Sequence, residues 1–293
     1  MSKDVQAFLP KTSRDRYWLP GSPPRRRLKD LGTVERLLGP NDYLPDLRIP
    51  VRPINLWSFE NRESSTLGPY FKRRGHFGDK SRRNEEEALY LFHGCATEIS
   101  PDLLHSFARH GPSIHFSRPQ SYFSRAPAVY WTDSLDFAFA WCVFSETGRW
   151  IPDITPGSKP FECLVYVSKV DAAILANPGK CFHIAEPDAD HMEMQLVDWC
   201  NANMEKSNPI NRIPPPGSDK ADWSVISSRI PKHTMESLVC ADFPDMPALG
   251  KTEVRQMWMY AACDETSSSQ IASAGIEILH LFSHPADMTR PKL

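Results

Sequence analysis

The sequence predicts an α+β protein with short strands and peripheral helices, preceded by a long polar segment. Two observations predict this class. Short apolar runs rich in β-branched and aromatic residues alternate with segments whose apolar residues recur at helical spacing. Proline is also abundant, with 27 Pro against 14 Gly in 293 residues. This composition favours rigid turns and extended connections over long helices.

The composition gives no indication of a nucleic-acid, metal or membrane partner. A net charge of -2 and a pI near 6.6 provide no overall attraction to nucleic acid. The seven cysteines include no Cys-x-x-Cys pair and no Cys/His spacing suited to zinc, so we expect reduced thiols and no metal site. No apolar run has the length of a signal peptide or a membrane span. We therefore expect a cytoplasmic or nuclear protein without a membrane partner or a clear nucleic-acid partner.

The first 87 residues are predicted to form an N-terminal arm that is proline-rich, basic and partly disordered. Its first 50 residues are polar, with one short helix expected around 33–38, and residues 60–87 contain almost no aliphatic side chains. The folded domain is expected to occupy residues 88–293.

The domain opens with two strand–helix units. "ALYLFHG" at 88–94 predicts a buried strand closed by glycine, and "SPDLLHSFARHG" predicts a helix capped by Ser100 and ended by Gly111. "PAVYWTDSLDFAFAWCVF" at 127–144 predicts a strand, a polar turn with capping residues and a strongly apolar helix.

Further strands and helices are predicted downstream. We expect strands in "FECLVYVSKV", "WSVISSRI", "SLVCADF" and "AGIEILHLF". "DAAILANPG" predicts a short helix, and "DHMEMQLVDWCNANME" has apolar residues at helical spacing. "PINRIPPPGSDKADW" predicts a loop, and "KTEVRQMWMYAACDET" is compatible with either a helix or a strand.

One ordered pair of motifs carries the functional argument. A strand ending in His93-Gly94 precedes a helix, and then "AVYWTDSLDFAFAWC" supplies a second strand with Tyr130 and a helix with Ala-x-x-Trp. This order resembles the ADP-ribosyltransferase (ART) superfamily, in the branch of diphtheria toxin and poly(ADP-ribose) polymerase. It is also similar to mostly uncharacterised microbial and fungal ART-like proteins. "LVDWCNANME", "ADWSVISSRIPKHT" and "VRQMWMYA" match later segments of that pattern, so the resemblance spans about residues 88–282.

The resemblance implies a split mixed or antiparallel sheet that binds NAD as substrate. His93 would hydrogen-bond the adenosine-side ribose or the nearby NAD backbone. Gly94 would let the nicotinamide amide approach the main chain, and Tyr130 would stack under the nicotinamide ring. The other cofactor-binding candidates are Thr132, Ser113 and Arg125, of which the arginine would grip the pyrophosphate.

Cleavage of the nicotinamide–ribose bond passes through an oxocarbenium-like state, as glycoside cleavage does. The family's third site residue, a glutamate in catalysing members, holds the ribose 2′-hydroxyl and stabilises that state. In this chain the candidates are Gln256 and Glu253 in the late strand. The expected activity is mono-ADP-ribosyl transfer to an unknown macromolecular acceptor, or NAD hydrolysis. For an enzyme we expect His93, Tyr130 and one of these two residues to line one cleft.

Two alternatives remain open, and several other kinds of site are not supported. Cys95 stands where a hydroxyl residue is common and Ala128 where glycine is common, which favours a catalytically inactive ART-like interaction protein. An unrelated α+β domain with chance motifs is another interpretation. A Cys95–His93 nucleophile pair has no orienting third group. The acidic segment 186–191 lacks the glycine and spacing of an EF-hand, and there is no P-loop or G-x-G-x-x-G motif.

Overall fold

The described part of the chain forms one mixed sheet. The computed structural model describes residues 49–55, 70, 89–95, 107–148, 150, 161–184, 190–205, 211–231 and 257–283. The eight strands are β1 (Val51–Asn55), β2 (Leu89–Cys95), β3 (Val129–Thr132), β4 (Phe161–Val170), β5 (Cys181–His183), β6 (Val225–Arg229), β7 (Trp258–Ala262) and β8 (Gly275–Ser283). The helices in this part are α6 (Leu135–Thr147), α7 (Ala172–Leu175), α8 (Asp190–Met204) and α11 (Glu265–Ser273), with one 3-10 turn, η4 (Ile114–Phe116).

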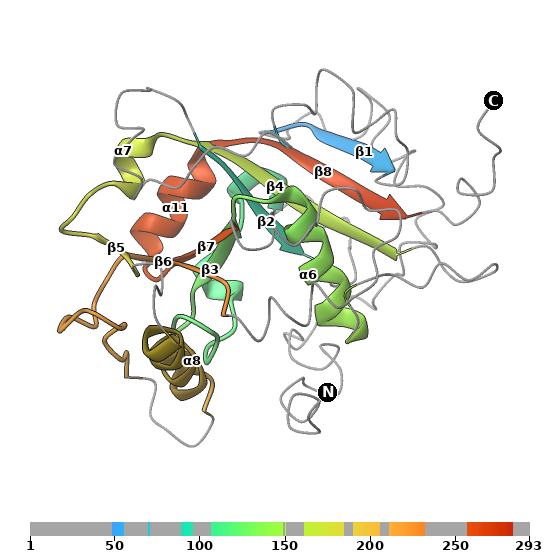
Figure 1. The fold of residues 1–293 in the computed structure, drawn as a ribbon. Helices are drawn as coiled ribbons and strands as arrows, with labels where there is room; N and C mark the ends of the chain where they lie inside the picture. Colours follow the sequence, from blue (N-terminus) through green and yellow to red (C-terminus); the bar gives the residue numbers. More distant parts are fainter. Residues whose placement is uncertain are drawn as a thin grey trace, which may run out of the picture.

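The strand order is β1-β8-β4-β2-β3-β7-β6-β5 (Figure 1). The six inner strands pair antiparallel, whereas the two edge strands, β1 and β5, run parallel to their neighbours. This mixed sheet with few helices confirms the α+β class. Within the described residues, no helix combines the length and the apolar composition needed to cross a bilayer.

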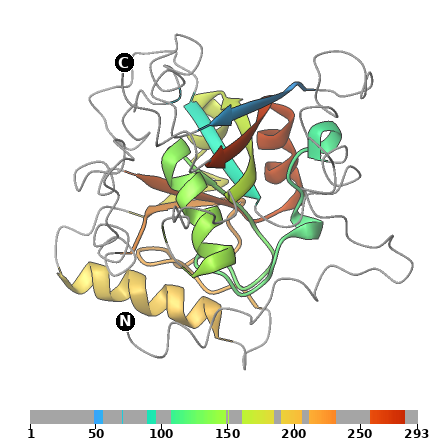
Figure 2. The same ribbon diagram turned by 90° about the vertical axis from the view of Figure 1, so that its right-hand side faces the viewer.

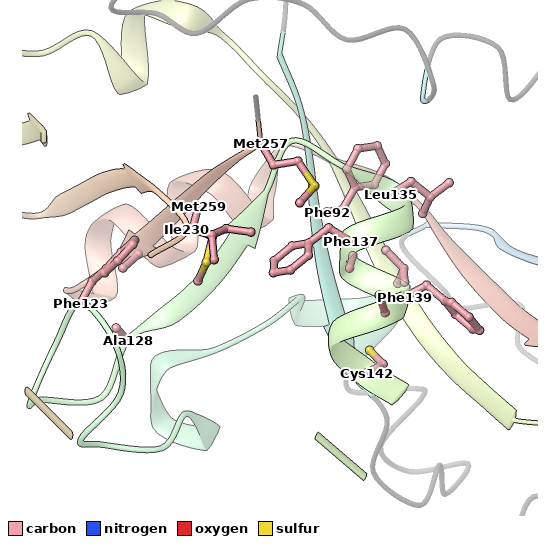
Figure 3. Close-up of a cluster of buried hydrophobic side chains, with 14 of the residues drawn as sticks. Phe92, Phe123, Ala128, Leu135, Phe137, Phe139, Cys142, Ile230, Met257 and Met259 are labelled. Atoms are coloured by element: carbon pink, nitrogen blue, oxygen red, sulfur yellow. The ribbon is translucent and has the colours of Figure 1, made fainter. Parts of the chain in front are cut away.

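Each face of the sheet buries its own hydrophobic cluster. The first cluster includes the buried side of α6, together with Leu196 and Trp199 of α8. Figure 2 shows α6 running along the sheet with α8 set apart from it, and Figure 3 shows Phe92 beside the apolar side chains of α6. The second cluster includes Leu175 of α7 and Ile271 of α11. Both faces are therefore covered by helices, as the alternating apolar residues of the inner strands require.

The ladder between β2 and β3 is the shortest part of the sheet. It consists of the single pair Phe92 and Thr132, whereas β2 pairs with β4 along its whole length from Leu89 to Cys95. Strand β3 meanwhile pairs with β7 from Val129 to Thr132. The two halves of the sheet are thus joined at one residue pair.

Helix α6 begins and ends as the sequence indicates. The Ser134 hydroxyl accepts a hydrogen bond from the Phe137 N–H at 3.2 Å, which satisfies one of the free donors of the first turn. Gly148 closes the helix with φ of 72°, a left-handed conformation that favours glycine. The helix between these caps is almost wholly buried, because apolar residues occupy nearly every side.

Strand β1 comes from the segment predicted as an arm, so residues 51–55 of that segment belong to the sheet. Its place at the edge explains why the sequence pattern missed it, since an edge strand tolerates the proline at position 53. The side chain of Arg52 donates to Glu277 of β8 at 2.7 Å, and the Tyr70 hydroxyl donates to the same carboxylate.

The other expected elements agree in large part. The predicted strands at β2, β3, β4, β6 and β8 and the helices at α6, α7 and α8 are confirmed, and the ambiguous segment contains β7. Residues 107–110 are helical and Gly111, with φ of 74°, ends that turn, while the start of this helix and "SLVCADF" lie outside the described residues. Helix α11 was missed because its sequence, ETSSSQIAS, is rich in serine, and its start depends on Asp264, whose carboxylate accepts from Ser267 N–H.

Candidate functional site

The candidate site lies where the β2–β3 ladder ends. The pair Phe92–Thr132 fixes the register, so His93 lies opposite Trp131 and Gly94 opposite Tyr130, although neither pair continues the ladder. Because neighbouring residues of a strand face opposite sides, the His93 side chain and the open side of the Gly94 α-carbon lie on different faces of the sheet.

The imidazole of His93 bridges the two strands. Its Nδ1 lies 2.7 Å from the main-chain carbonyl oxygen of Tyr130. A carbonyl oxygen only accepts, so Nδ1 carries the proton and Nε2 carries a lone pair. The ring lies between the aromatic rings of Phe107 and Trp131, with centroids at 5.9 and 5.5 Å. This side chain thus replaces a ladder hydrogen bond that the parting strands no longer make.

Burial keeps this histidine neutral. Desolvation lowers the pKa of His93 to about 4 and outweighs the opposing effect of its hydrogen bond to Tyr130. At neutral pH the imidazole is therefore uncharged, with Nδ1–H as donor and Nε2 as acceptor. Such a group is suited to accept a hydrogen bond from a hydroxyl.

Gly94 has a packing reason for lacking a side chain. A Cβ at this position would lie 2.8 Å from the main-chain oxygen of Ala138 and closer still to the sulfur of Cys142. Both belong to α6, so the glycine lets this helix approach β2. The space above the α-carbon is occupied by the helix, and an approach of nicotinamide to the main chain stays a prediction.

The hydroxyl of Tyr130 is held by a preceding turn. It accepts from the Phe123 N–H at 2.8 Å and from the Ser121 hydroxyl at 2.8 Å. The ring packs against Phe123, with centroids 6.0 Å apart. Burial raises the pKa of this phenol far above its ordinary value, so it stays protonated.

The structure therefore joins His93 to the main chain of Tyr130 and not to its ring. The His93 ring contacts Phe107 and Trp131 of the second hydrophobic cluster, while the Tyr130 ring packs on the first. The two rings lie on opposite faces of the sheet, which differs from the single cleft expected for an enzyme.

Three further predicted cofactor-binding residues have structural partners. The hydroxyl of buried Thr132 accepts from the Ser134 N–H at 3.2 Å and thereby supports the start of α6. Ser113 caps the short turn η4, with its hydroxyl accepting from the His115 N–H at 3.3 Å. Arg125 donates from Nε to the carbonyl oxygen of Ala202 in the last turn of α8 at 2.9 Å. Among the described residues no hydrogen bond joins Ser113 or Arg125 to His93.

The two candidates for the third site residue lie just before the described part of β7. Gln256 and Glu253 fall outside the described residues, but Gln256 immediately precedes Met257, which is fully buried in the first cluster with Phe92 (Figure 3). The adjacent Trp258 N–H donates to the Asp133 carboxylate at 2.9 Å. The start of β7 is thus tied to the turn that follows β3.

The sequence reasoning missed the turn at 120–125. Its residues hold the Tyr130 hydroxyl, yet "QSYFSR" has no motif that marks a site. The one local signal was the Ser and Tyr content between two prolines, which predicts a turn of any kind. Within the described residues no group of three or more His, Cys, Asp or Glu side chains could hold a metal ion.

The partly buried His183 bonds to groups on two other elements. His183 Nε2 lies 2.9 Å from the Leu175 carbonyl oxygen, and Nδ1 contacts the hydroxyl of Ser227, which has no exposed surface. Because Ser227 has no exposed surface, its hydroxyl is closed to a substrate.

Comparisons with known proteins give no relative: no family model, no curated protein and no solved structure matches the chain.

Proposed function

We propose that this chain is an ART-like protein that binds NAD where β2 and β3 part, and that it cleaves the nicotinamide–ribose bond. The transferred ADP-ribose goes to a macromolecular acceptor or to water. The observation that carries the proposal is the His93–Tyr130 bridge, in which a neutral imidazole is held with one nitrogen fixed and the other able to accept from a ribose hydroxyl.

The order of the strands supports the proposal. The His93 strand, the Tyr130 strand and the late strand preceded by Gln256 are β2, β3 and β7, which are consecutive neighbours in the sheet. In the family that the sequence resembles, these three strands carry the site residues. Strands that are far apart in the chain are therefore neighbours in the sheet.

Binding of NAD and cleavage of the nicotinamide–ribose bond would depend on different residues. His93 Nε2 is an acceptor for a ribose hydroxyl and does not need to change its charge at neutral pH. Stabilising positive charge at the anomeric carbon needs a further polar group, and Gln256 or Glu253 would supply it. A glutamate would do so electrostatically, whereas a glutamine would only hold the 2′-hydroxyl.

A second candidate function is a non-catalytic ART-like interaction protein. Two observations favour it. The rings of His93 and Tyr130 pack on opposite faces, and α6 occupies the space where a Cβ of Gly94 would project. In that case the fold persists with a site that has lost its dinucleotide geometry.

One experiment separates these functions. NAD is titrated into the full chain by calorimetry and nicotinamide release is measured, with the double variant His93→Ala/Tyr130→Ala and the exposed His115→Ala as control. Binding and release that are lost in the double variant and kept in the control support an enzyme. Binding without release identifies the non-catalytic protein, and an absence of both refutes the NAD proposal.

A further inference from the structure

The hydroxyl of Tyr130 is fixed by a small closed turn. The Gln120 N–H donates to the Arg125 carbonyl oxygen at 2.8 Å, and Ser121 and Ser124 exchange main-chain hydrogen bonds of 3.0 and 3.2 Å. Gln120 has φ of 57°, a left-handed conformation. The ends of the turn are thus held together, and its interior presents the Ser121 hydroxyl and the Phe123 N–H to Tyr130.

Helix α8 holds this turn from outside the sheet. Arg125, which is only 9% exposed, donates to the Ala202 carbonyl oxygen, and its positive charge lies at the negative end of the helix. Asn203, which has no exposed surface, donates from Nδ2 to the Tyr122 carbonyl oxygen at 3.1 Å. The ring of Phe123 also stacks on Trp199, with centroids 5.7 Å apart and planes at 21°. Side chains on both partners therefore fasten the turn to the last turns of α8.

The same contacts continue to His93. The Tyr130 hydroxyl accepts a hydrogen bond from Ser121 of the turn, and its main-chain carbonyl oxygen accepts one from Nδ1–H of His93. Tyr130 therefore connects the turn to the imidazole of His93 through two of its own groups.

We propose that Ser121 is a positioning residue for Tyr130, and that Asn203 and Arg125 of the α8 contact support it, so that α8 controls the geometry of the β2–β3 site. The consequence for NAD rests on the proposed function. The positional coupling between α8 and Tyr130 does not.

The coupling is tested by NMR on the full chain labelled with ¹³C at the ζ carbon of tyrosine, without nucleotide. The Tyr130 signal is identified by its loss in Tyr130→Phe. We expect Ser121→Ala and Asn203→Leu each to shift this signal. Ser121→Thr keeps the hydroxyl and should retain the wild-type position, and Ser273→Ala, which removes an exposed helix hydroxyl, should leave the signal unchanged. Arg125→Lys replaces Asn203→Leu if the latter does not fold.

Calorimetric titration of NAD is the second measurement. If the Ser121 hydrogen bond holds the Tyr130 ring ready for NAD, Ser121→Ala weakens NAD binding by up to about five-fold, the equivalent of one neutral hydrogen bond, and Ser273→Ala leaves it unchanged. An unmoved Tyr130 signal in both Ser121→Ala and the α8 variant overturns the inference. If the signals move but the wild-type chain binds no NAD, the proposed function fails and the positioning role stands.

Discussion

The substitution Gly94→Ala tests the packing of α6 on β2. The added methyl group would lie 2.8 Å from the Ala138 carbonyl oxygen, a distance that real Cβ atoms do not adopt, and would overlap the Cys142 sulfur. The carbonyl belongs to the helix main chain, so relief requires α6 to move as a body. Overpacking of this kind costs about 1–3 kcal/mol of unfolding free energy.

Urea denaturation of the full chain measures this cost. The control is Gly179→Ala, where the nearest atom to the added Cβ is a side-chain oxygen at 3.4 Å and almost no loss is expected. The double variant Gly94→Ala/Cys142→Ala removes one of the two overlaps. It should therefore be more stable than the sum of the single effects predicts, by at least about 0.5 kcal/mol.

A small loss of stability in Gly94→Ala would contradict the packing role of this glycine. If Gly94→Ala lowers the unfolding free energy by less than about 0.5 kcal/mol, the size of an ordinary surface effect, the α6 contact does not require glycine. A variant of full stability that loses NAD binding would assign Gly94 to ligand approach instead of helix packing.

Three further predictions concern the same elements. Tyr130→Phe leaves the Phe123 N–H without its acceptor, whereas the Ser121 hydroxyl keeps the Ser124 carbonyl oxygen as an alternative. Urea denaturation should show a loss of about 1–3 kcal/mol, and an unchanged midpoint would contradict the contact. The pKa of His93 is lowered from 6.5 in the unfolded chain to about 4 in the folded one, so the unfolded chain binds the proton more readily. The free energy of unfolding should therefore decline as pH falls from 6.5 to 4. His93→Gln should remove that part of the pH dependence, and an equal slope in both proteins would argue against it. Glu277→Ala removes the shared partner of Arg52 and Tyr70, so hydrogen exchange of residues 51–55 should accelerate, and unchanged protection would show that β1 does not depend on this carboxylate.

The inner elements of the fold were predictable because their sequences carry strong patterns. "LYLFHGC" and "FECLVYVSKV" each contain a short run of apolar residues, and Ser134 and Gly148 mark both ends of an apolar helix. Strand β1 could not be found in this way, since its stability comes from pairing with β8 and from Glu277 and not from its own sequence.

The candidate site was predictable in its residues but not in its geometry. Motif order indicates residues 93 and 130, and their strands lie side by side in the sheet. Which side chains share a face depends on the register set by Phe92 and Thr132, and a shift of one residue would exchange them. No local pattern encodes that register. Likewise, the contacts of Arg125 and Asn203 with the opposite segment depend on where α8 packs.

The central claim is that His93 offers Nε2 to a ribose hydroxyl of NAD while Nδ1 stays bonded to Tyr130. Its most direct test is ¹⁵N NMR of the full chain with labelled histidine at neutral pH. We expect the His93 signals of a neutral ring protonated at Nδ1, and addition of NAD should move the Nε2 signal more than the Nδ1 signal. A His93 spectrum that shows a charged ring, or that does not change at saturating NAD, would contradict the account.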